Sequence, residues 1–196
     1  MLILASESPR RRELLAVAGF EFTVRARPVA EIRAAAESPV AYVRRLAREK
    51  ARAAQQAVQN AARESGDEIV LGADTVVVLG DRVLEKPVDA ADARSMLRAL
   101  SGREHVVITG ICLVRADREM VDSESTRVHF VEWSDREIDD YVATGEPMDK
   151  AGGYAIQGLA SKFVDRIEGC YFNVMGLPLA MVYRHLRAFD EKQIGR

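Results

Sequence analysis

The sequence has no excess of positive charge, few cysteines and no long apolar run. Its 196 residues include 28 Lys and Arg against 30 Asp and Glu, a formal net charge of −2, so the basic footprint of general nucleic-acid binding is missing. Cys112 and Cys170 are far apart and form no CxxC pair, which favours two small core residues over a disulfide or a metal site. No apolar run reaches the roughly 18 residues that a membrane span needs. We therefore expect neither nucleic acid nor a membrane as a partner.

Targeting signals and familiar phosphate motifs are missing as well. Met1 precedes a strand-like segment and an arginine cluster instead of a signal peptide, so we expect a cytoplasmic protein. There is no GxxxxGKS/T run of a P-loop enzyme, and His105, His129 and His185 lack metal-ligand spacing, which indicates structural or surface histidines. Without repeats, low-complexity tracts or linkers, the length predicts a single domain over residues 1–196.

Residues 2–15 join a short apolar strand directly to a cationic helix start. We expect Ser8 to cap this helix through its hydroxyl and Pro9 to occupy the first helical position. The unpaired amides at the positive end of the helix, together with the guanidinium groups of Arg10 and Arg11, favour an anion with several oxygens, such as a triphosphate. The alternative is a well-capped surface helix whose arginines are solvated.

Strand-like and helix-like segments alternate unevenly, which predicts an α/β fold with a mixed sheet. A long helix opens at Ser38-Pro39, and Lys50 lies in its apolar stripe, either snorkelling into water or facing a site. A buried strand over residues 69–74 delivers Asp74 at its end, residues 75–79 continue in extended conformation up to a turn at Gly80-Asp81, and a hairpin follows. The remaining predicted helices span residues 89–100, 134–144 and a segment from Pro178. The remaining predicted strands span residues 20–24, 105–114, 125–133 and 162–167. Residues 149–158 are predicted to form a loop.

Several charged side chains suit phosphoryl chemistry. Asp74 and Glu31 are carboxylates, and Lys50, Lys86 and Arg10 supply positive charge. Carboxylates hold Mg²⁺ or Mn²⁺ and orient or deprotonate water, while cations neutralise charge on phosphate oxygens. Composition alone does not bring these groups together. Asp74 could be a cap or turn residue after a strand, and Glu31 could be a solvated loop acid.

In their order and spacing, several segments together resemble the Maf (septum formation) family of nucleotide pyrophosphatases. The matching segments are residues 4–11, 48–51, 72–75, 85–87, 100–103, 146–154, 156–158 and 173–178. The resemblance covers nearly the whole chain. It implies hydrolysis of a nucleoside triphosphate between the α and β phosphates, a divalent cation (Mg²⁺ or Mn²⁺) and a homodimer. It also implies a two-lobed α/β fold of the Maf and ITPase-like kind, around a long mixed β-sheet flanked by helices.

The resemblance also implies roles for individual residues. Asp74 would accept the proton of the attacking water, and Glu31 would be the second carboxylate near the metal or the water. The cations and hydroxyl that would hold phosphates are Ser6, Arg10, Lys50 and Lys86, and further substrate-binding positions are Arg11, Thr75, Asp149, Lys150 and Gln157. Asp149 and Lys150 could instead form a loop ion pair. The sequence departs from the family pattern at two positions: it has Ala30 where family members often have an acid, and Ala160 where many have a glycine.

Residues 149–152 and 156–158 resemble the branch of the family that prefers dTTP and UTP, a preference associated with Arg10, Thr75 and Gln157. The Gln157 carboxamide offers a donor and an acceptor side by side, which matches the edge of uracil or thymine, whereas cytosine inverts that pattern. The alternative for Gln157 is a loop amide bonded to its own backbone. Two other functions also stay open: a nucleotidyltransferase, and a non-catalytic nucleotide sensor that influences cell division.

Overall fold

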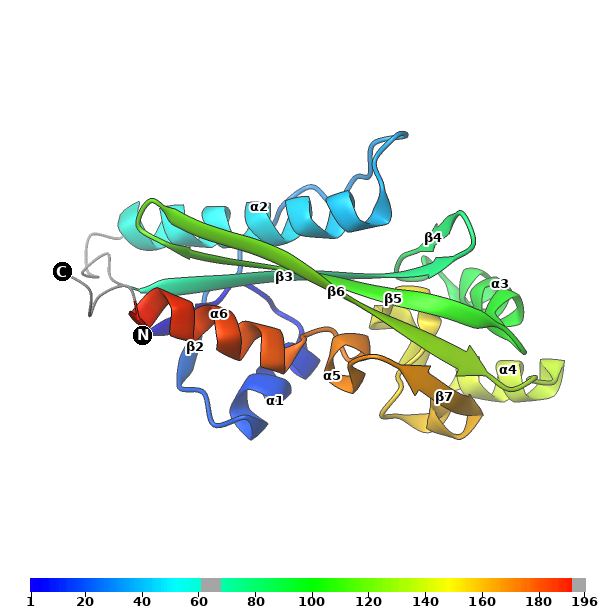
Figure 1. Ribbon diagram of the computed structural model, residues 1–196. Coiled ribbons are helices and arrows are strands. Elements are labelled where there is room, and N and C mark those ends of the chain that lie inside the picture. The colour runs from blue at the N-terminus through cyan, green and yellow to red at the C-terminus, as the bar shows by residue number, and fades with distance from the viewer. Residues whose placement is uncertain (61–67, 192–196) are drawn as a thin grey trace. The chain divides into compact units, whose positions relative to one another are not determined.

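The computed structural model describes residues 1–60 and 68–191 of the chain (Figure 1). Within these residues, a seven-stranded sheet has the strand order β2-β1-β3-β5-β6-β7, and β4 pairs with β3. The strands are β1 (Leu2–Leu4), β2 (Phe22–Val24), β3 (Ile69–Leu79), β4 (Arg82–Leu84), β5 (Glu104–Arg115), β6 (Arg118–Phe130) and β7 (Val164–Glu168). β1 is parallel to β2 and β3, whereas β4 is antiparallel to β3 and β7 is antiparallel to β6. The predicted α/β class with a mixed sheet is therefore confirmed.

The helices lie between and beside these strands in the chain. They are α1 (Pro9–Val17), α2 (Pro39–Asn60), α3 (Ala90–Leu100), α4 (Asp135–Ala143), α5 (Tyr171–Val174) and α6 (Leu179–Glu191). Three 3₁₀ turns are η1 (Glu146–Asp149), η2 (Ala151–Gly153) and η3 (Leu159–Phe163). None of the helices in the described part of the chain has the length and apolar character that a bilayer-spanning segment requires.

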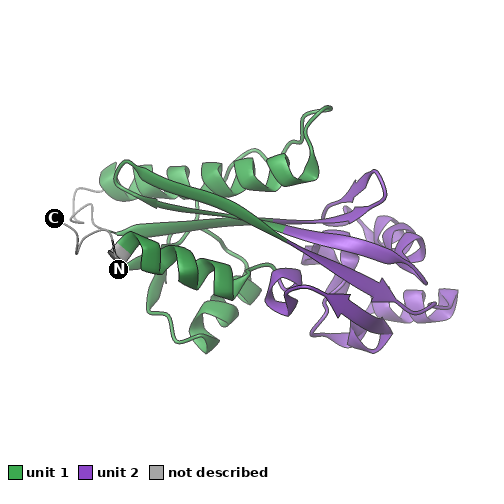
Figure 2. Ribbon diagram, viewed as in Figure 1, with its two compact units in different colours: residues 1–74, 109–124, 176–196 green, residues 75–108, 125–175 purple. Residues whose placement is uncertain are grey.

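The chain forms two compact units, which Figure 2 colours separately. Unit 1 comprises residues 1–74, 109–124 and 176–196, and unit 2 comprises residues 75–108 and 125–175. The strands β3, β5 and β6 contribute residues to both units. The single domain over residues 1–196 stays a prediction.

In unit 1, α2 lies on one face of the strands, and α1 and α6 lie on the other (Figure 1). Small residues of α2 pack on the sheet, where Ala47, Ala51 and Ala54 are fully buried together with Ile3 and Val70. The helix approaches β3 closely at Gly72. A Cβ on residue 72 would lie 2.1 Å from the carbonyl oxygen of Ala47 and 2.8 Å from the amide nitrogen of Ala51. A glycine inside an apolar strand thus lets the backbones of α2 and β3 meet.

The residues at the two ends of α1 agree only in part with the capping predicted from the sequence. Pro9 occupies the first turn as predicted, but the predicted hydroxyl cap is wrong, because the Ser8 side chain makes no capping hydrogen bond. The backbone N–H of Ser8 instead donates to Ser6 Oγ at 3.3 Å. At the other end, Gly19 has a φ of +76°, and the N–H groups of Gly19 and Phe20 donate to the carbonyls of Ala16 and Leu15. This is the bond pattern of a Schellman ending.

Unit 2 has an aromatic core. Trp133 stacks on Phe163 with 3.5 Å between the ring centroids, and Phe130 and Tyr154 meet edge to face. His105 is buried, and its Nε2 lies 2.7 Å from the Tyr154 hydroxyl, so it is a structural histidine, as predicted. Residues of α3, α4 and η3 complete this core.

Helix starts in unit 2 follow the sequence closely, whereas some boundaries do not. Asp89 accepts from the N–H of Asp92 at the start of α3, and Ser134 and Glu137 form a reciprocal capping box at the start of α4. The predicted loop over residues 149–158 contains η2 and the end of η1. Asp74 lies within β3 and not at its end, whereas the extended conformation predicted for residues 75–79 and the hairpin after them are confirmed, because β3 continues to Leu79 and pairs there with Arg82 of β4.

We predict that Gly72→Ala destabilises the fold strongly, because the new Cβ would overlap the α2 backbone. The expected loss in the free energy of unfolding is about 3 kcal/mol. The matched control is Gly19→Ala, where nothing lies within 4 Å of the new Cβ and the positive φ is the main penalty, about 1 kcal/mol. Urea unfolding of both variants measures the difference. Equal losses would contradict a close approach of α2 and β3.

Candidate active site

Asp74 lies within β3 and is only 7% exposed. Burial raises the pKa of the Asp74 carboxyl above its ordinary value, because loss of water disfavours the charged form. The charges of Lys50 and Arg11 oppose this rise, since each favours the ionised carboxylate. The site therefore contains a carboxylate with unusual proton affinity, placed on a rigid strand.

Lys50 on α2 joins this carboxylate to a second one. Its Nζ lies 2.6 Å from Asp74 Oδ1 and 2.6 Å from Glu31 Oε1, and its side chain is 13% exposed. The ammonium thus binds two carboxylates instead of projecting into solvent. Lys50 can reach Asp74 because Ala47 and Ala51, on the same helix, pack against Gly72 on β3.

Glu31 comes from the loop between β2 and α2, and its side chain is 46% exposed. The predicted alternative was a solvated loop acid, but the carboxylate forms a close ion pair with Lys50. The structure therefore brings Asp74, Lys50 and Glu31 together within unit 1, from a strand, a helix and a loop. Their catalytic roles stay predictions.

Arg11 is a second, more deeply buried cation of unit 1. Its Nε donates to the carbonyl of Gly176 at 2.8 Å, and its Nη1 donates to Ser6 Oγ at 3.0 Å. Burial lowers the pKa of Arg11, and the Asp74 charge opposes that change. These bonds fasten the turn between β1 and α1 to the segment that leads into α6. Arg10, one residue earlier on α1, is half-buried.

The remaining predicted site residues belong to unit 2. Thr75 is half-buried and directly follows Asp74, whereas Lys86 and Gln157 are exposed. Lys150 Nζ binds Asp149 Oδ1 at 2.5 Å and also donates to the carbonyl of Glu146 at 2.6 Å. The loop ion pair that we held open for Asp149 and Lys150 is therefore present. Substrate binding by these residues stays a prediction.

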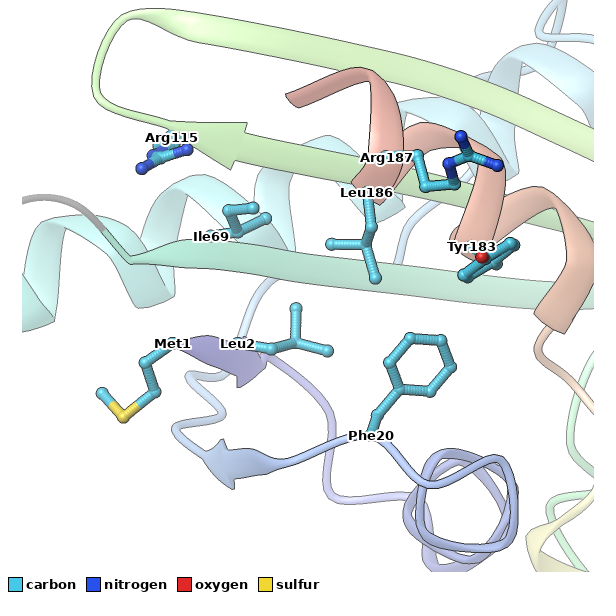
Figure 3. A pocket seen from close by; sticks show the side chains of 8 residues that line it. All are labelled: Met1, Leu2, Phe20, Ile69, Arg115, Tyr183, Leu186 and Arg187. Carbon is cyan, nitrogen blue, oxygen red and sulfur yellow. The ribbon is translucent and has the colours of Figure 1, made fainter. Parts of the chain in front are cut away.

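A hollow of about 320 Å³ also opens in unit 1 (Figure 3). Its apolar walls come from Leu2 and Ile69 of the sheet, from Leu186 of α6, and from Phe20, which lies just before β2 (Figure 3). The other lining residues are Met1, Arg115, Tyr183 and Arg187. None of these residues belongs to the predicted site.

The donor set of Asp74 and Glu31 fits a hard divalent cation. Both side chains offer carboxylate oxygens, and both already surround one positive charge, the Lys50 ammonium. Among the residues that the structure describes, no cluster of three or more His, Cys, Asp or Glu could hold a metal ion. Mg²⁺ commonly binds through one or two carboxylates plus waters and substrate phosphates, so two carboxylates suffice for such a site.

Two features of the site were missed by the sequence analysis. Gly72 determines how close α2 comes to β3, and the signal for it was a glycine inside an otherwise apolar strand. The Gly176 carbonyl that accepts from Arg11 had no local signal, because the two residues are 165 positions apart in the chain.

Several known proteins are similar to this chain. The family model described as "Maf-like protein" matches residues 1–189. A protein of Koribacter versatilis named "dTTP/UTP pyrophosphatase" is 54% identical over 95% of this chain and 93% of its own length. A protein of Vibrio cholerae with the same name is 51% identical over 91% of this chain and 92% of its own length. The solved structure of the Staphylococcus aureus Ham1 protein covers 66% of this chain and 71% of its own, with a TM-score of 0.44 and 14% identity.

We predict that Lys50→Met raises the pKa of Asp74 further, because burial would then act without the nearest opposing charge. Titration of the Asp74 carboxyl carbon by NMR measures this change without reference to any activity. The matched control is Arg48→Met, on the same helix, where the substitution removes an exposed ion pair with Glu119. An Asp74 titration that is the same in Lys50→Met and in the unsubstituted protein would contradict the electrostatic coupling.

Proposed function

This chain belongs to the Maf-like protein family, and we propose that it is a nucleoside triphosphate pyrophosphatase. It hydrolyses dTTP and UTP between the α and β phosphates, releasing the nucleoside monophosphate and pyrophosphate. The names of relatives at 54% and 51% identity support this substrate class. The protein acts as a homodimer in the cytoplasm, as the family resemblance implies.

The observation that carries the proposal is the Lys50 ammonium bound to the carboxylates of Asp74 and Glu31. Phosphoryl chemistry needs positive charge next to the phosphate oxygens and a base next to the attacking water. This cluster has both kinds of group within hydrogen-bonding distance of each other.

Asp74 accepts a proton from the attacking water. The water oxygen forms a new bond to phosphorus, the bond to the pyrophosphate oxygen breaks, and the water proton passes to an Asp74 carboxylate oxygen. Burial raises the pKa of this carboxyl, which makes the ionised form a stronger base than an exposed aspartate. Lys50 and Arg11 limit the rise, so the carboxylate is still available to take the proton.

Glu31 and Asp74 would also hold a divalent cation, Mg²⁺ or Mn²⁺, which would supply positive charge next to the phosphate oxygens. Lys50 contributes positive charge to the same group of oxygens once substrate is bound. In the structure, Lys50 binds Asp74 and Glu31, the two carboxylates to which we assign proton transfer and metal binding.

The other site residues hold the two ends of the nucleotide. Ser6, Arg10 and Lys86 bind phosphates, and Thr75, Asp149 and Lys150 contact the substrate. Arg11 supports phosphate binding through Ser6, because its Nη1 donates a hydrogen bond to Ser6 Oγ at 3.0 Å. Gln157 reads the base, because its exposed carboxamide can offer a donor and an acceptor to uracil or thymine.

Product analysis tests the reaction. The protein is incubated with each nucleoside triphosphate and Mg²⁺ or Mn²⁺, and the expected products are the monophosphate and pyrophosphate, with water as the acceptor. Asp74→Asn should lower kcat by about 10²- to 10⁴-fold, because it removes the base. Diphosphate plus orthophosphate would contradict the cleavage position. Transfer to a sugar phosphate would indicate a nucleotidyltransferase, and binding without turnover would indicate a sensor.

Base selection is tested by Gln157→Ala. We expect the unsubstituted protein to use both dTTP and UTP, since the thymine methyl is worth at most about 200-fold in a hydrophobic pocket, and to discriminate against CTP. The substitution should reduce the UTP to CTP ratio of kcat/KM by about 10-fold or more. Leu159→Ala, at another exposed position of the same segment, is the matched control. Equal turnover of CTP and UTP, or an unchanged ratio in the variant, would refute this role.

A further inference from the structure

Residues 25–38 join β2 to α2 and carry Glu31, and the structure describes this segment as a loop without helix or strand. Ile32, next to Glu31, is 76% exposed, and the Glu31 side chain is 46% exposed. Little apolar burial therefore holds this part of the loop in place. The Glu31 end of its ion pair with Lys50 is open to solvent, so this contact restrains the loop less than a fully buried ion pair would.

Arg45 on α2 binds the same loop through two branches of its guanidinium. Its Nε and Nη2 lie 2.7 and 2.8 Å from the two carboxylate oxygens of Glu37, a bidentate arrangement. Its Nη2 also donates to the backbone carbonyl of Ile32 at 2.9 Å. Glu37 in turn accepts from the N–H of Ala34 at 3.3 Å. One side chain of α2 thus restrains both the residue after Glu31 and the end of the loop.

The Arg45 side chain is itself held in position. Its Nη1 donates to Glu49 Oε1, one turn further along α2, at 3.1 Å. Its guanidinium carbon lies 5.4 Å from the centroid of the Tyr42 ring, and Tyr42 is 1% exposed. Hydrogen bonds to Glu37 and Glu49 raise the pKa of Arg45, so the fork is always charged. Two residues of α2, Glu49 and Tyr42, therefore help to orient the guanidinium.

Arg45 and Lys50 hold consecutive residues of the loop from one helix. Lys50 binds the side chain of Glu31, and Arg45 binds the backbone of Ile32. A backbone hydrogen bond next to an acid restricts where its carboxylate can lie more than a bond between two long side chains does. Both cations lie on α2, which packs closely against β3 at Gly72. The position of the loop therefore depends on the same helix that carries Lys50.

We propose that Arg45, with Glu37, is a positioning residue that holds the Glu31 loop on α2, so that the Glu31 carboxylate meets the Lys50 ammonium. Its catalytic consequence rests on the function proposed above, in which Glu31 acts at the reacting phosphates. Arg45 binds Glu37 and the Ile32 carbonyl and acts on the site through the loop. The sequence analysis did not single out this residue, because its contacts with Glu37 and the Ile32 carbonyl depend on how the loop folds against α2.

The first test measures the loop without reference to activity. Hydrogen exchange by mass spectrometry is followed in peptides covering residues 30–38 for the unsubstituted protein, Arg45→Met and Arg45→Lys. We expect both variants to lose protection there, since lysine retains the charge but cannot form the fork. The matched control is Arg48→Met on the same helix, whose partner Glu119 lies on β6, and it should leave these peptides unchanged. Unchanged protection in Arg45→Met would overturn the proposal.

The second test asks whether Arg45 acts through Glu31. Arg45→Met should lower kcat for dTTP by about 10- to 100-fold in the unsubstituted background, because a misplaced group at the reacting centre costs rate. In a Glu31→Gln background the same substitution should have no further effect on kcat. Equal losses in both backgrounds would overturn the role in positioning Glu31. Glu37→Gln, which retains Arg45, provides a milder variant if Arg45→Met does not fold.

The two tests separate failure of this inference from failure of the proposed function. If the protein hydrolyses no nucleoside triphosphate, the proposed function fails, while the exchange data still decide whether Arg45 holds the loop. If activity is present and exchange in residues 30–38 does not respond to Arg45, the proposed function stands and the positioning role fails.

Discussion

The ammonium of Lys50 is the interaction on which the site depends. A carboxylate as deeply buried as Asp74 is unfavourable unless a positive charge compensates for the lost water, and Lys50 Nζ lies 2.6 Å away. The same ammonium binds Glu31, so one cation joins a strand to a loop. Arg11 adds a second buried charge to the field at Asp74, although its own hydrogen bonds go to Ser6 and Gly176.

The close packing of α2 makes this arrangement possible. A lysine on a helix can reach a carboxylate within a sheet only if the two backbones come near each other. The absence of a Cβ at Gly72 permits that approach, and the small side chains of Ala47 and Ala51 complete it. The same helix presents Arg45 to the loop that carries Glu31. Packing and chemistry therefore both depend on α2, and a change that moves this helix would move Lys50 and Arg45 together.

Local signals allowed much of the fold to be predicted from the sequence. The caps at Asp89 and Ser134, the proline at the start of α1 and the glycine after its end act within one turn of helix, so a short window contains all partners. Ser8 shows the limit of such signals, because its N–H bonds to Ser6 Oγ and its hydroxyl makes no cap. The extended character predicted for residues 75–79 is confirmed, because β3 continues to Leu79 and pairs there with β4.

The sequence by itself determined the chemical inventory of this protein: an α/β pattern, the carboxylates, the cations and the ordered segments that resemble the Maf family. Only the tertiary structure decided which charges meet. Lys50 and Asp74 are 24 positions apart, and Arg11 and Gly176 are 165 apart, so no local spacing specifies their contact. The physical reason is that such pairs form through the packing of elements, which depends on volumes and backbone approach across the whole unit.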